Sequence, residues 1–376
     1  MKFLLIYVPN LRFAGYIDNY RTCKLIDISE IVTRTNENNS EYPIMMISAG
    51  KGFIAQSEKY SRDNAGTSIN KYILLKKGEL AYNRGNSKQF PYGAIYEMKE
   101  ECALIPYVYH CFNIYDESTR YFSHYLNSPF KDEQLSKIIT SSVRGNGLLN
   151  ISKNDFFNLS LNVPSIKEQN KIAKFLDLID QRIQTQSKII DSYFSLSKAI
   201  SNTLIGQSKG NTRLRECLNC YSSNTMESVI KQEDLGDYPV YGANGIIKKI
   251  NNYEIEYPSI AIVKDGSGVG KMFKLSGKYS ILSTLNYLTS KPGYDIDYIY
   301  YALKQKSLKK YVVGSGIPHI YFKDYEQEKI YIPQNELQQQ NITSVLQSID
   351  EEIGNEIKQL KNYELLKKYL LKNMFV

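Results

Sequence analysis

The sequence is poor in residues that usually ligate metals, form disulfides or carry out covalent catalysis. It has only three histidines and five cysteines, and the odd number and scattered spacing of the cysteines argue against a disulfide framework. Cys217 and Cys220 form a single CxxC, whereas a structural zinc site needs four ligands, usually including a second such pair. We therefore expect reduced thiols and no bound metal.

Motifs that would carry catalysis are also missing. The stretch DGSGVGKMF (Asp265–Phe273) approaches a phosphate-binding loop, but its first glycine is misplaced and Met272 stands where Ser or Thr is required, so a glycine-rich turn is favoured. Gly242–Ile246 (GANGI) lacks the strand–GxGxxG–helix context of a dinucleotide site. Neither GxSxG, HExxH nor an amino-methyltransferase [NDS]-P-P-[YFW] occurs. We expect a binding protein, not an enzyme.

No apolar run approaches the roughly 18 residues of a membrane span. The apolar run of residues 3–8 has only six members, too few for a signal-peptide core. These observations predict a cytoplasmic protein with no membrane partner.

The composition is that of a globular protein, because apolar residues make up 42% and charged residues 23% of the 376 positions. The net charge is +8. This mild basic excess is compatible with a polyanionic partner, but a basic protein that binds no nucleic acid would show it as well.

One segment of the sequence occurs twice. Residues 143–164 match residues 312–333 at an offset of 169 without a gap, and after one inserted residue the match continues at an offset of 170. A period near 170 is far longer than the roughly 20–50 residues of solenoid repeats. It corresponds to a domain plus a connector, so the sequence predicts a duplicated two-part unit.

Each copy of the repeat contains an apolar stripe with a mean spacing of 3.5 residues, as in the seam of a coiled coil. Both stripes have polar breaks at the same two places. We expect two helices of about 35–40 residues, each about 55 Å long, that pack on each other; the alternative is that each packs on its own globular part. The predicted seam is Ile172, Leu176, Ile179, Ile183 and Ile190 in the first helix, and Ile342, Leu346, Ile349, Ile353 and Leu360 in the second.

The rest of the chain lacks long helical periodicity. Residues 72–84 and 259–275 read as strand, glycine-bearing turn, strand, and residues 119–128 and 295–307 read as short helices. The predicted fold is mixed α/β, with two globular domains joined by two long antiparallel connector helices. Its predicted parts are domain 1 (1–163), connector 1 (164–206), domain 2 (207–332) and connector 2 (333–376).

Four stretches resemble one known family. They are NVPSIKEQNKIAKFLDLIDQRI (162–183), YIPQNELQQQNITSVLQSIDEEI (331–353), VPNLRFAGY (8–16) and LLKKYLLKNMF (365–375). The chain is similar to the specificity subunits of type I restriction-modification systems. It departs from the pattern where Gln338–Gln339 and one inserted residue stand in place of Glu168–Gln169, which predicts a slightly different start for the second helix.

The resemblance implies a mechanism and partners. Each domain would read one half of a bipartite site on double-stranded DNA, and the paired helices would fix the spacing between the halves. The helices would also bind two methyltransferase subunits, which bring S-adenosylmethionine and modify adenine. Restriction subunits, which use ATP and Mg²⁺, would join this core; the chain itself would hold no cofactor.

Candidate DNA-contacting residues are basic or amide side chains in predicted loops, since such groups bind phosphates and base edges. Each could equally be a solvated surface charge. The repeated glycines at 145, 147, 314 and 316 could allow close approach to DNA or form turns closing onto the connector. The candidates are Lys51, Arg62, Arg84, Lys88 and Arg144 in the first domain, and Asn244, Lys264, Lys271, Lys274 and Lys278 in the second.

Two other classes of function compete with DNA recognition. A two-domain scaffold that binds proteins without recognising DNA would also need two unlike domains on like connectors. A nuclease with a dispersed carboxylate–lysine site would require metal-dependent cleavage by the isolated chain. Sequence-specific duplex binding that weakens with salt would exclude the scaffold, and the absence of such cleavage would exclude the nuclease.

Overall fold

The computed structural model describes residues 8–36, 41–59, 66–85, 87, 90–139, 148–230 and 236–376. The chain forms two compact units. The first comprises Met1–Gln186 and Gln359–Val376, and the second is Ser187–Lys358. Each unit therefore contains one globular part and a portion of both long helices.

The first unit is built on an antiparallel four-stranded sheet in the order β2–β9–β6–β7. Short helix α2 lies against β7, and its Tyr121, Phe122 and Tyr125 are buried in the main apolar core. The strands of this unit are β1 (Arg21–Lys24), β2 (Ser29–Ile31), β3 (Met45–Ser48), β4 (Gly52–Ala55), β5 (Ile73–Lys76), β6 (Leu80–Asn83), β7 (Ala94–Glu97), β8 (Cys102–Ile105), β9 (His110–Ile114) and β10 (Ser160–Val163). Its short helices are α1 (Gln56–Lys59), α2 (Thr119–Tyr125), α3 (Pro129–Ile138) and α4 (Lys153–Phe157).

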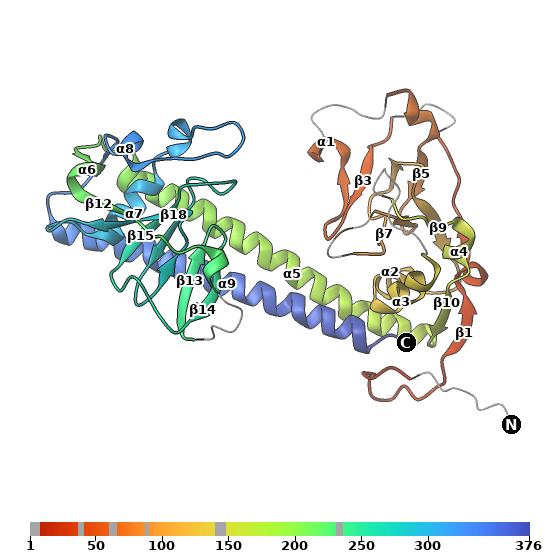
Figure 1. Cartoon of the computed structure of the whole chain (residues 1–376). Coiled ribbons are helices and arrows are strands. Elements are labelled where there is room, and N and C mark those ends of the chain that lie inside the picture. The colour runs from red at the N-terminus through yellow and green to blue at the C-terminus, as the bar shows by residue number, and fades with distance from the viewer. Residues whose placement is uncertain are drawn as a thin grey trace. The chain divides into compact units, whose positions relative to one another are not determined.

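The second unit has a four-stranded antiparallel sheet in the order β12–β18–β15–β16, and helix α7 lies against β15 and β16 (Figure 1). A smaller sheet pairs β13 with β14 and β17. The strands are β11 (Thr212–Arg213), β12 (Leu218–Ser222), β13 (Tyr238–Gly242), β14 (Gly245–Ile250), β15 (Ser259–Val263), β16 (Met272–Leu275), β17 (Ser280–Ile281), β18 (Leu285–Ser290) and β19 (Lys329–Ile330). The short helices are α6 (Leu214–Cys217), α7 (Ile296–Lys304) and α8 (Phe322–Tyr325).

The two globular parts share one topology although their sequences differ. In each, the first strand pairs with the last (β1 with β10, β11 with β19), and the main sheet repeats the same strand order. Even a local capping contact recurs. The Lys24 amide donates to Asp27 Oδ2 at 2.8 Å, and the Arg213 amide donates to Glu216 Oε2 at 2.9 Å. The predicted strand–turn–strand segments and short helices are confirmed, and the duplication extends beyond the visible sequence repeat.

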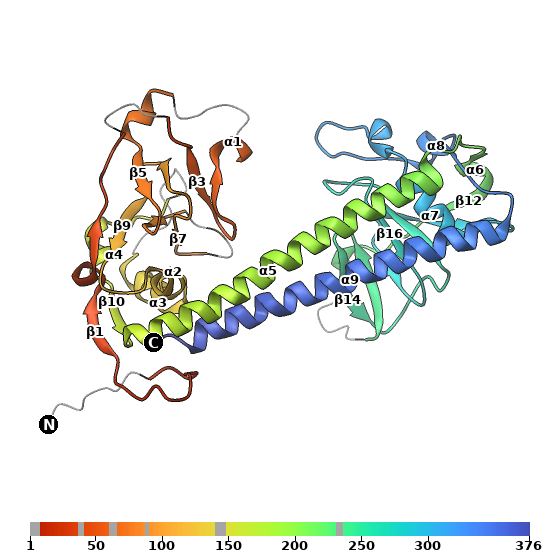
Figure 2. The same ribbon diagram turned by 180° about the vertical axis from the view of Figure 1, so that it is seen from behind.

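The two long helices are α5 (Ile166–Ser201) and α9 (Glu336–Asn373), of 36 and 38 residues. Their first residues lie 170 positions apart, so the inserted residue lies in the turn before α9. The helix α5 begins two residues after Pro164 and α9 begins three residues after Pro333, which is the slight difference in helix start that the sequence predicts. The start of α5 and the end of α9 belong to the first unit, so the helices run antiparallel there (Figure 2). In that unit Lys367 Nζ lies 2.5 Å from Asp180 Oδ1.

Six of the ten predicted seam residues are buried, and the other four are half-buried. At the helix ends the stripe packs on the globular parts, since Ile172 and Leu176 belong to the core of the first unit, and Ile342 and Leu346 to that of the second. Ile190 and Ile353 are buried but belong to neither core, and in the first unit Arg182 Nε of α5 donates to the Tyr363 hydroxyl of α9 at 3.2 Å. Helix pairing and packing on the globular part therefore both occur. The buried residues are Ile172, Leu176, Ile190, Ile342, Leu346 and Ile353; the half-buried ones are Ile179, Ile183, Ile349 and Leu360.

Candidate nucleic-acid interface

The hairpin between β15 and β16 forms the centre of the candidate interface in the second unit. Its loop contains Gly266 and Gly270 with φ of 90° and 85°, a conformation that glycine adopts without strain. The Gly266 amide donates to the Pro318 carbonyl at 2.8 Å, and the Ile320 amide donates to the Lys264 carbonyl at 2.9 Å. The second copy of the repeated glycine segment therefore lies along this loop.

The turn between β13 and β14 joins the same cluster. Lys271 Nζ donates to Asn244 Oδ1 at 3.1 Å, and a Cβ atom at Gly268 would lie 3.5 Å from that of Ala243. Asn244 and Lys271 are both exposed, and Lys264 is half-buried. The backbone of Lys264 and the side chains of Asn244 and Lys271 thus lie where three loops meet. Asn244 and Lys271 present amide and ammonium groups of the kind that bind bases and phosphates.

Gly314 has a structural reason to be glycine. Its φ is 95°, and a Cβ atom there would lie 2.5 Å from the Ile317 carbonyl oxygen, whereas nothing lies within 4 Å of such an atom at Gly316. Of the two interpretations drawn from the sequence, Gly314 supports the one in which the repeated glycines form turns. The segment closes onto the hairpin loop of its own unit, however, and not onto a long helix. Gly145 and Gly147 lie outside the described residues.

Lys274 and Lys278 lie away from the three-loop cluster. Lys274 Nζ is 3.4 Å from Asp297 Oδ2 and 6.0 Å from the centre of the Tyr301 ring, both on α7. Lys278 Nζ lies 4.7 Å from the centre of the Tyr253 ring. Tyr253 also contacts Tyr238, which stands at the opposite end of β13 from the Asn244 turn.

The first unit repeats the contact between glycine segment and hairpin loop. The Leu149 amide donates to the Arg84 carbonyl at 3.0 Å, and Gly85 forms a bridge with Leu148. The Arg84 guanidinium donates to the carbonyls of Ile151 at 3.1 Å and Val108 at 3.3 Å. Arg84 therefore holds residues 148–151, which follow the repeated glycines, against the hairpin. Arg62, Lys88 and Arg144 lie outside the described residues.

His110 lies behind this contact and was not singled out as a candidate from the sequence. It is 4% exposed and lies beside the stacked rings of Tyr82 and Phe156, each 5.9 Å away. Burial, followed by the positive charge of Arg84, lowers the pKa of His110 to about 4. The imidazole is therefore neutral at neutral pH.

Lys51 lies in the exposed turn between β3 and β4. The Gly50 amide of this turn donates to the Tyr96 hydroxyl at 2.9 Å, and the Tyr96 ring contacts Phe90 at 6.4 Å. Tyr96, on β7, thus joins the Lys51 turn to the segment that follows the β6 hairpin loop. Only the three-dimensional pairing of the strands identifies Tyr96, because nothing in its local sequence marks it.

The described part of the chain contains no group of three or more His, Cys, Asp or Glu side chains placed to hold a metal ion. All five cysteines are free. Cys217 of the CxxC is buried, and its Sγ donates weakly to the Leu214 carbonyl at 3.5 Å. Neither long helix, nor any other helix among the described residues, is apolar enough over sufficient length to cross a membrane.

Comparison with known proteins is consistent with this geometry. Residues 212–362 match the sequence model of the type I restriction modification DNA specificity domain. A specificity subunit of the type I restriction enzyme MjaVIII from Methanocaldococcus jannaschii is 34% identical over 169 residues, which cover 41% of this chain and 39% of that subunit. The match therefore spans about two fifths of the archaeal protein's length.

Solved structures share the fold over nearly the whole chain. The crystal structure of a type I restriction-modification system S subunit from M. genitalium superimposes with a TM-score of 0.66, at 16% identity, covering 98% of this chain and 99% of that one. A chain from a study of complex assembly and conformational transition of the type I restriction-modification system gives a TM-score of 0.52, at 14% identity, covering 96% and 98%.

A duplicated α/β unit on a pair of long helices is the architecture these proteins have in common. The resemblance seen in the sequence is confirmed: residues 212–362 match the type I restriction modification DNA specificity domain, and the chain is similar to a type I specificity subunit over 169 residues.

Proposed function

We propose that this chain determines the DNA sequence specificity of a type I restriction-modification complex and is not itself catalytic. Each globular part reads one half of a bipartite site on double-stranded DNA. The observation that carries the proposal is the family match over residues 212–362, because that range contains the three-loop cluster at Asn244 and Lys271.

The duplication supports a bipartite target. Two globular parts with the same topology but different loop residues are suited to recognise two different base sequences by the same type of contact. The three-loop cluster of the second part presents the exposed Asn244 and Lys271, and the net charge of +8 favours a polyanion.

The paired helices set the distance between the two half-sites. A 36-residue helix is about 54 Å long at about 1.5 Å per residue, the length of about 16 base pairs at about 3.4 Å each. The helices also bind two methyltransferase subunits, which supply S-adenosylmethionine for adenine modification. Restriction subunits, using ATP and Mg²⁺, complete the complex, and the chain works in the cytoplasm.

The test is adenine methylation across a genome, mapped with and without this chain beside its methyltransferase partner. We expect one bipartite motif that depends on the chain. Exchanging residues 1–163 for those of another family member should alter one half of the motif only. Should no motif appear, and should the purified complex bind duplexes without sequence preference or salt dependence, the protein-binding scaffold would be the correct interpretation.

A further inference from the structure

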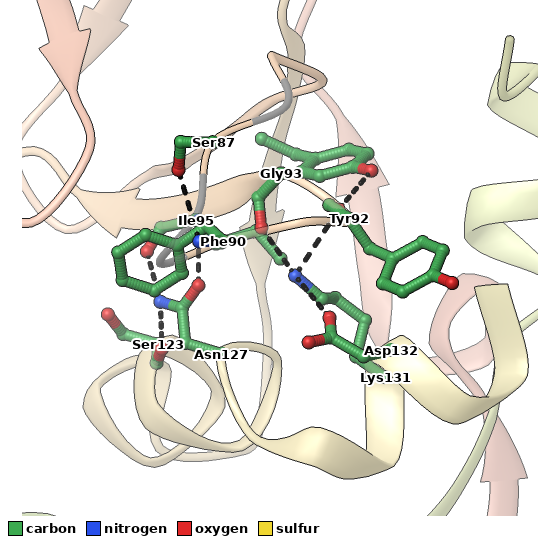
Figure 3. Close-up of polar contacts among 10 residues, drawn as sticks. Ser87, Phe90, Tyr92, Gly93, Ile95, Ser123, Asn127, Lys131 and Asp132 are labelled. Atoms are coloured by element: carbon green, nitrogen blue, oxygen red, sulfur yellow. Dashed lines mark hydrogen bonds and ion pairs between the residues drawn. The ribbon is translucent and has the colours of Figure 1, made fainter. Parts of the chain in front are cut away.

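Helix α3 carries a lysine whose ammonium group lies inside the first unit. The side chain of Lys131 is 1% exposed. Figure 3 shows its Nζ directed toward the chain that returns from the β6 hairpin loop into β7. Nζ donates to the Gly93 carbonyl at 2.6 Å and lies 3.5 Å from the Tyr92 carbonyl and 3.3 Å from Asp132 Oδ1. The Tyr82 ring lies 5.7 Å away.

A buried lysine is costly unless its charge is satisfied, so its partners indicate what it does. Here two of the three acceptors are backbone carbonyls, and Asp132 supplies one carboxylate oxygen. Three N–H donors thus meet three oxygens. Because two of these oxygens belong to consecutive residues of one segment, the ammonium fixes the path of that backbone.

The segment held by Lys131 has little freedom. Gly93 has a φ of 77°, and a Cβ atom there would lie 2.4 Å from the Asn83 carbonyl oxygen and 2.6 Å from the Tyr82 ring. The Gly93 amide donates to the Phe90 carbonyl at 3.2 Å. No other residue could bring its carbonyl to Lys131 along this path without a shift of the backbone.

Asn127 holds the next residues from the same corner between α2 and α3. Its Oδ1 accepts from the Ile95 amide at 3.0 Å, and its Nδ2 donates to the carbonyls of Ile95 at 2.5 Å and Ser123 at 2.9 Å (Figure 3). Lys131 and Asn127 together fasten residues 92–95. These contacts extend to the surface, because the Phe90 ring contacts Tyr96 and the Tyr96 hydroxyl accepts a hydrogen bond from the Gly50 amide.

The equivalent position in the second unit is not a lysine. At an offset of 177, Tyr121, Phe122 and Leu126 fall on Tyr298, Ile299 and Leu303, and all six are buried. At the same offset Lys131 falls on Leu308, which is buried in the apolar core. The ammonium is therefore not a requirement of the shared topology but a feature of the first unit.

We propose that Lys131 and Asn127 are positioning residues for the first recognition domain: they fix residues 90–95 and, through Tyr96, the Lys51 turn, so that this surface keeps the shape that reads its half-site. The inference rests on the proposed function. It assigns to two residues that are not among the predicted DNA contacts an effect on one half of the target only.

The proposal predicts a dependence on pH. Burial, opposed by Asp132, lowers the pKa of Lys131 to about 8. Two ionisable groups face it. Asp132 lies beside it on α3, and Tyr82 on β6 keeps its proton because burial raises its pKa well above 10. The neutral amine retains two donors for three acceptors, so the fastening weakens as the pH rises through about 8.

The contribution of Lys131 to the free energy of unfolding changes with pH in the opposite direction to half-site discrimination. The pKa of Lys131 lies below its ordinary value of 10.5 in the folded protein, so between about pH 8 and 10.5 the unfolded chain binds more protons at this group. Its contribution to stability therefore increases with pH in that window. A loss of half-site discrimination above pH 8 through this residue is not a loss of folding.

The experiment compares Lys131→Met with Lys137→Met in the complex with the methyltransferase subunits. Both lysines are on α3, but Lys137 is exposed and pairs with Glu133, 3.8 Å away. The probes are duplexes with the full methylated motif or with one half-site altered, and the exchange of residues 1–163 assigns the half-sites. We expect Lys131→Met to lower discrimination at the first half-site about tenfold and to leave the second unchanged. Lys137→Met should alter neither.

From pH 7 to 9, wild-type discrimination at the first half-site should fall, while that of Lys131→Met stays flat. Equal loss at both half-sites, or a wild-type profile retained in Lys131→Met, would overturn the proposal. If Lys131→Met does not assemble, Asn127→Asp removes the amide donors at nearly constant size and should give the same one-sided loss. Absence of any bipartite motif from the wild-type complex would instead refute the proposed function.

Discussion

The side-chain amide of Gln169 donates a hydrogen bond to the carbonyl of Pro164, 2.9 Å away, at the start of α5. Gln339 makes the same contact with Pro333 at 2.8 Å before α9. Both glutamines are buried. The residue inserted in the second copy lengthens the turn between proline and helix and leaves this contact intact. The repeat thus preserves a way of joining strand to helix, not only a sequence.

Replacing Gln169 with alanine should destabilise the first unit. Gln169 also accepts from the Ser118 amide at 3.0 Å and donates to Glu117, so the change leaves several buried polar groups without partners. We expect a loss of about 2–3 kcal/mol in the free energy of unfolding. Gln339→Ala should cost about 1 kcal/mol and the exposed Gln338→Ala under about 0.5 kcal/mol. Urea denaturation of the full chain measures all three, and equal midpoints would contradict the expectation.

Arg12 and Glu168 form an ion pair. Removing Arg12 alone should lower the free energy of unfolding more than removing both charges. Arg12 Nε and Nη2 donate to the two carboxylate oxygens of Glu168 at 2.8 and 2.7 Å, and Tyr20 donates to Oε1 at 3.2 Å. The Glu168 side chain is 1% exposed. Arg12→Ala would leave a buried charge uncompensated and should cost about 3–5 kcal/mol.

The double variant Arg12→Ala/Glu168→Gln should recover most of that loss, because no charge is then buried. This double variant resembles the second copy of the repeat, in which Gln338 stands at the position equivalent to Glu168. The measurement is again the free energy of unfolding in urea. A double variant as unstable as the single one would mean that Arg12 acts through packing and not through charge.

The long helices could be predicted because their signal is local and written twice. A stripe of 3.5-residue spacing determines which face of a helix is apolar, and its recurrence with the same polar breaks argues for a structural cause. The short helices α2 and α7 and the β15–β16 hairpin were also visible, since each depends on residues close in sequence. The common strand order of the two sheets was not visible, because different apolar residues satisfy the same positions.

The residue types of the candidate interface could be predicted from the sequence, but the directions in which their side chains point could not. Arg84 follows a strand in a predicted loop, yet its guanidinium binds the carbonyls of Val108 and Ile151, which long-range folding brings to it. Lys131 lies in the stretch PFKDEQLSK, which reads as a solvated helix but places one lysine in the core. Such placements depend on residues far apart in the chain, and no local pattern encodes them.

Ile353 should contribute to helix pairing far more than Ile357, one turn along α9. Ile353 is 6% exposed and Ile357 46% exposed. Ile353→Ala should cost about 2–4 kcal/mol, because it removes buried apolar area and leaves a cavity. Ile357→Ala should cost under about 0.5 kcal/mol. Urea unfolding of the full chain tests the difference, and similar costs for the two variants would mean that the predicted seam does not bury this face.

Acid should destabilise the first unit through His110. Its pKa is lowered to about 4, chiefly by burial, so between about pH 6.5 and 4 the unfolded chain binds a proton that the folded chain does not. Stability therefore falls as the pH drops through this window, by on the order of 3 kcal/mol. His110→Phe should flatten the profile there. Parallel profiles for wild type and His110→Phe would show that other groups cause the acid sensitivity.

Lys271 and Lys278 offer a matched test of the three-loop cluster in the second unit. Both are exposed lysines, but Lys271 joins Asn244 at the loop tips and Lys278 lies over Tyr253. If Lys271 contacts a DNA phosphate, Lys271→Ala in the methyltransferase complex should weaken duplex binding about threefold to tenfold. It should also reduce the salt slope by about 1. Lys278→Ala should change neither quantity. Binding titrations at several salt concentrations measure both, and equal effects of the two variants would place the DNA surface elsewhere on this unit.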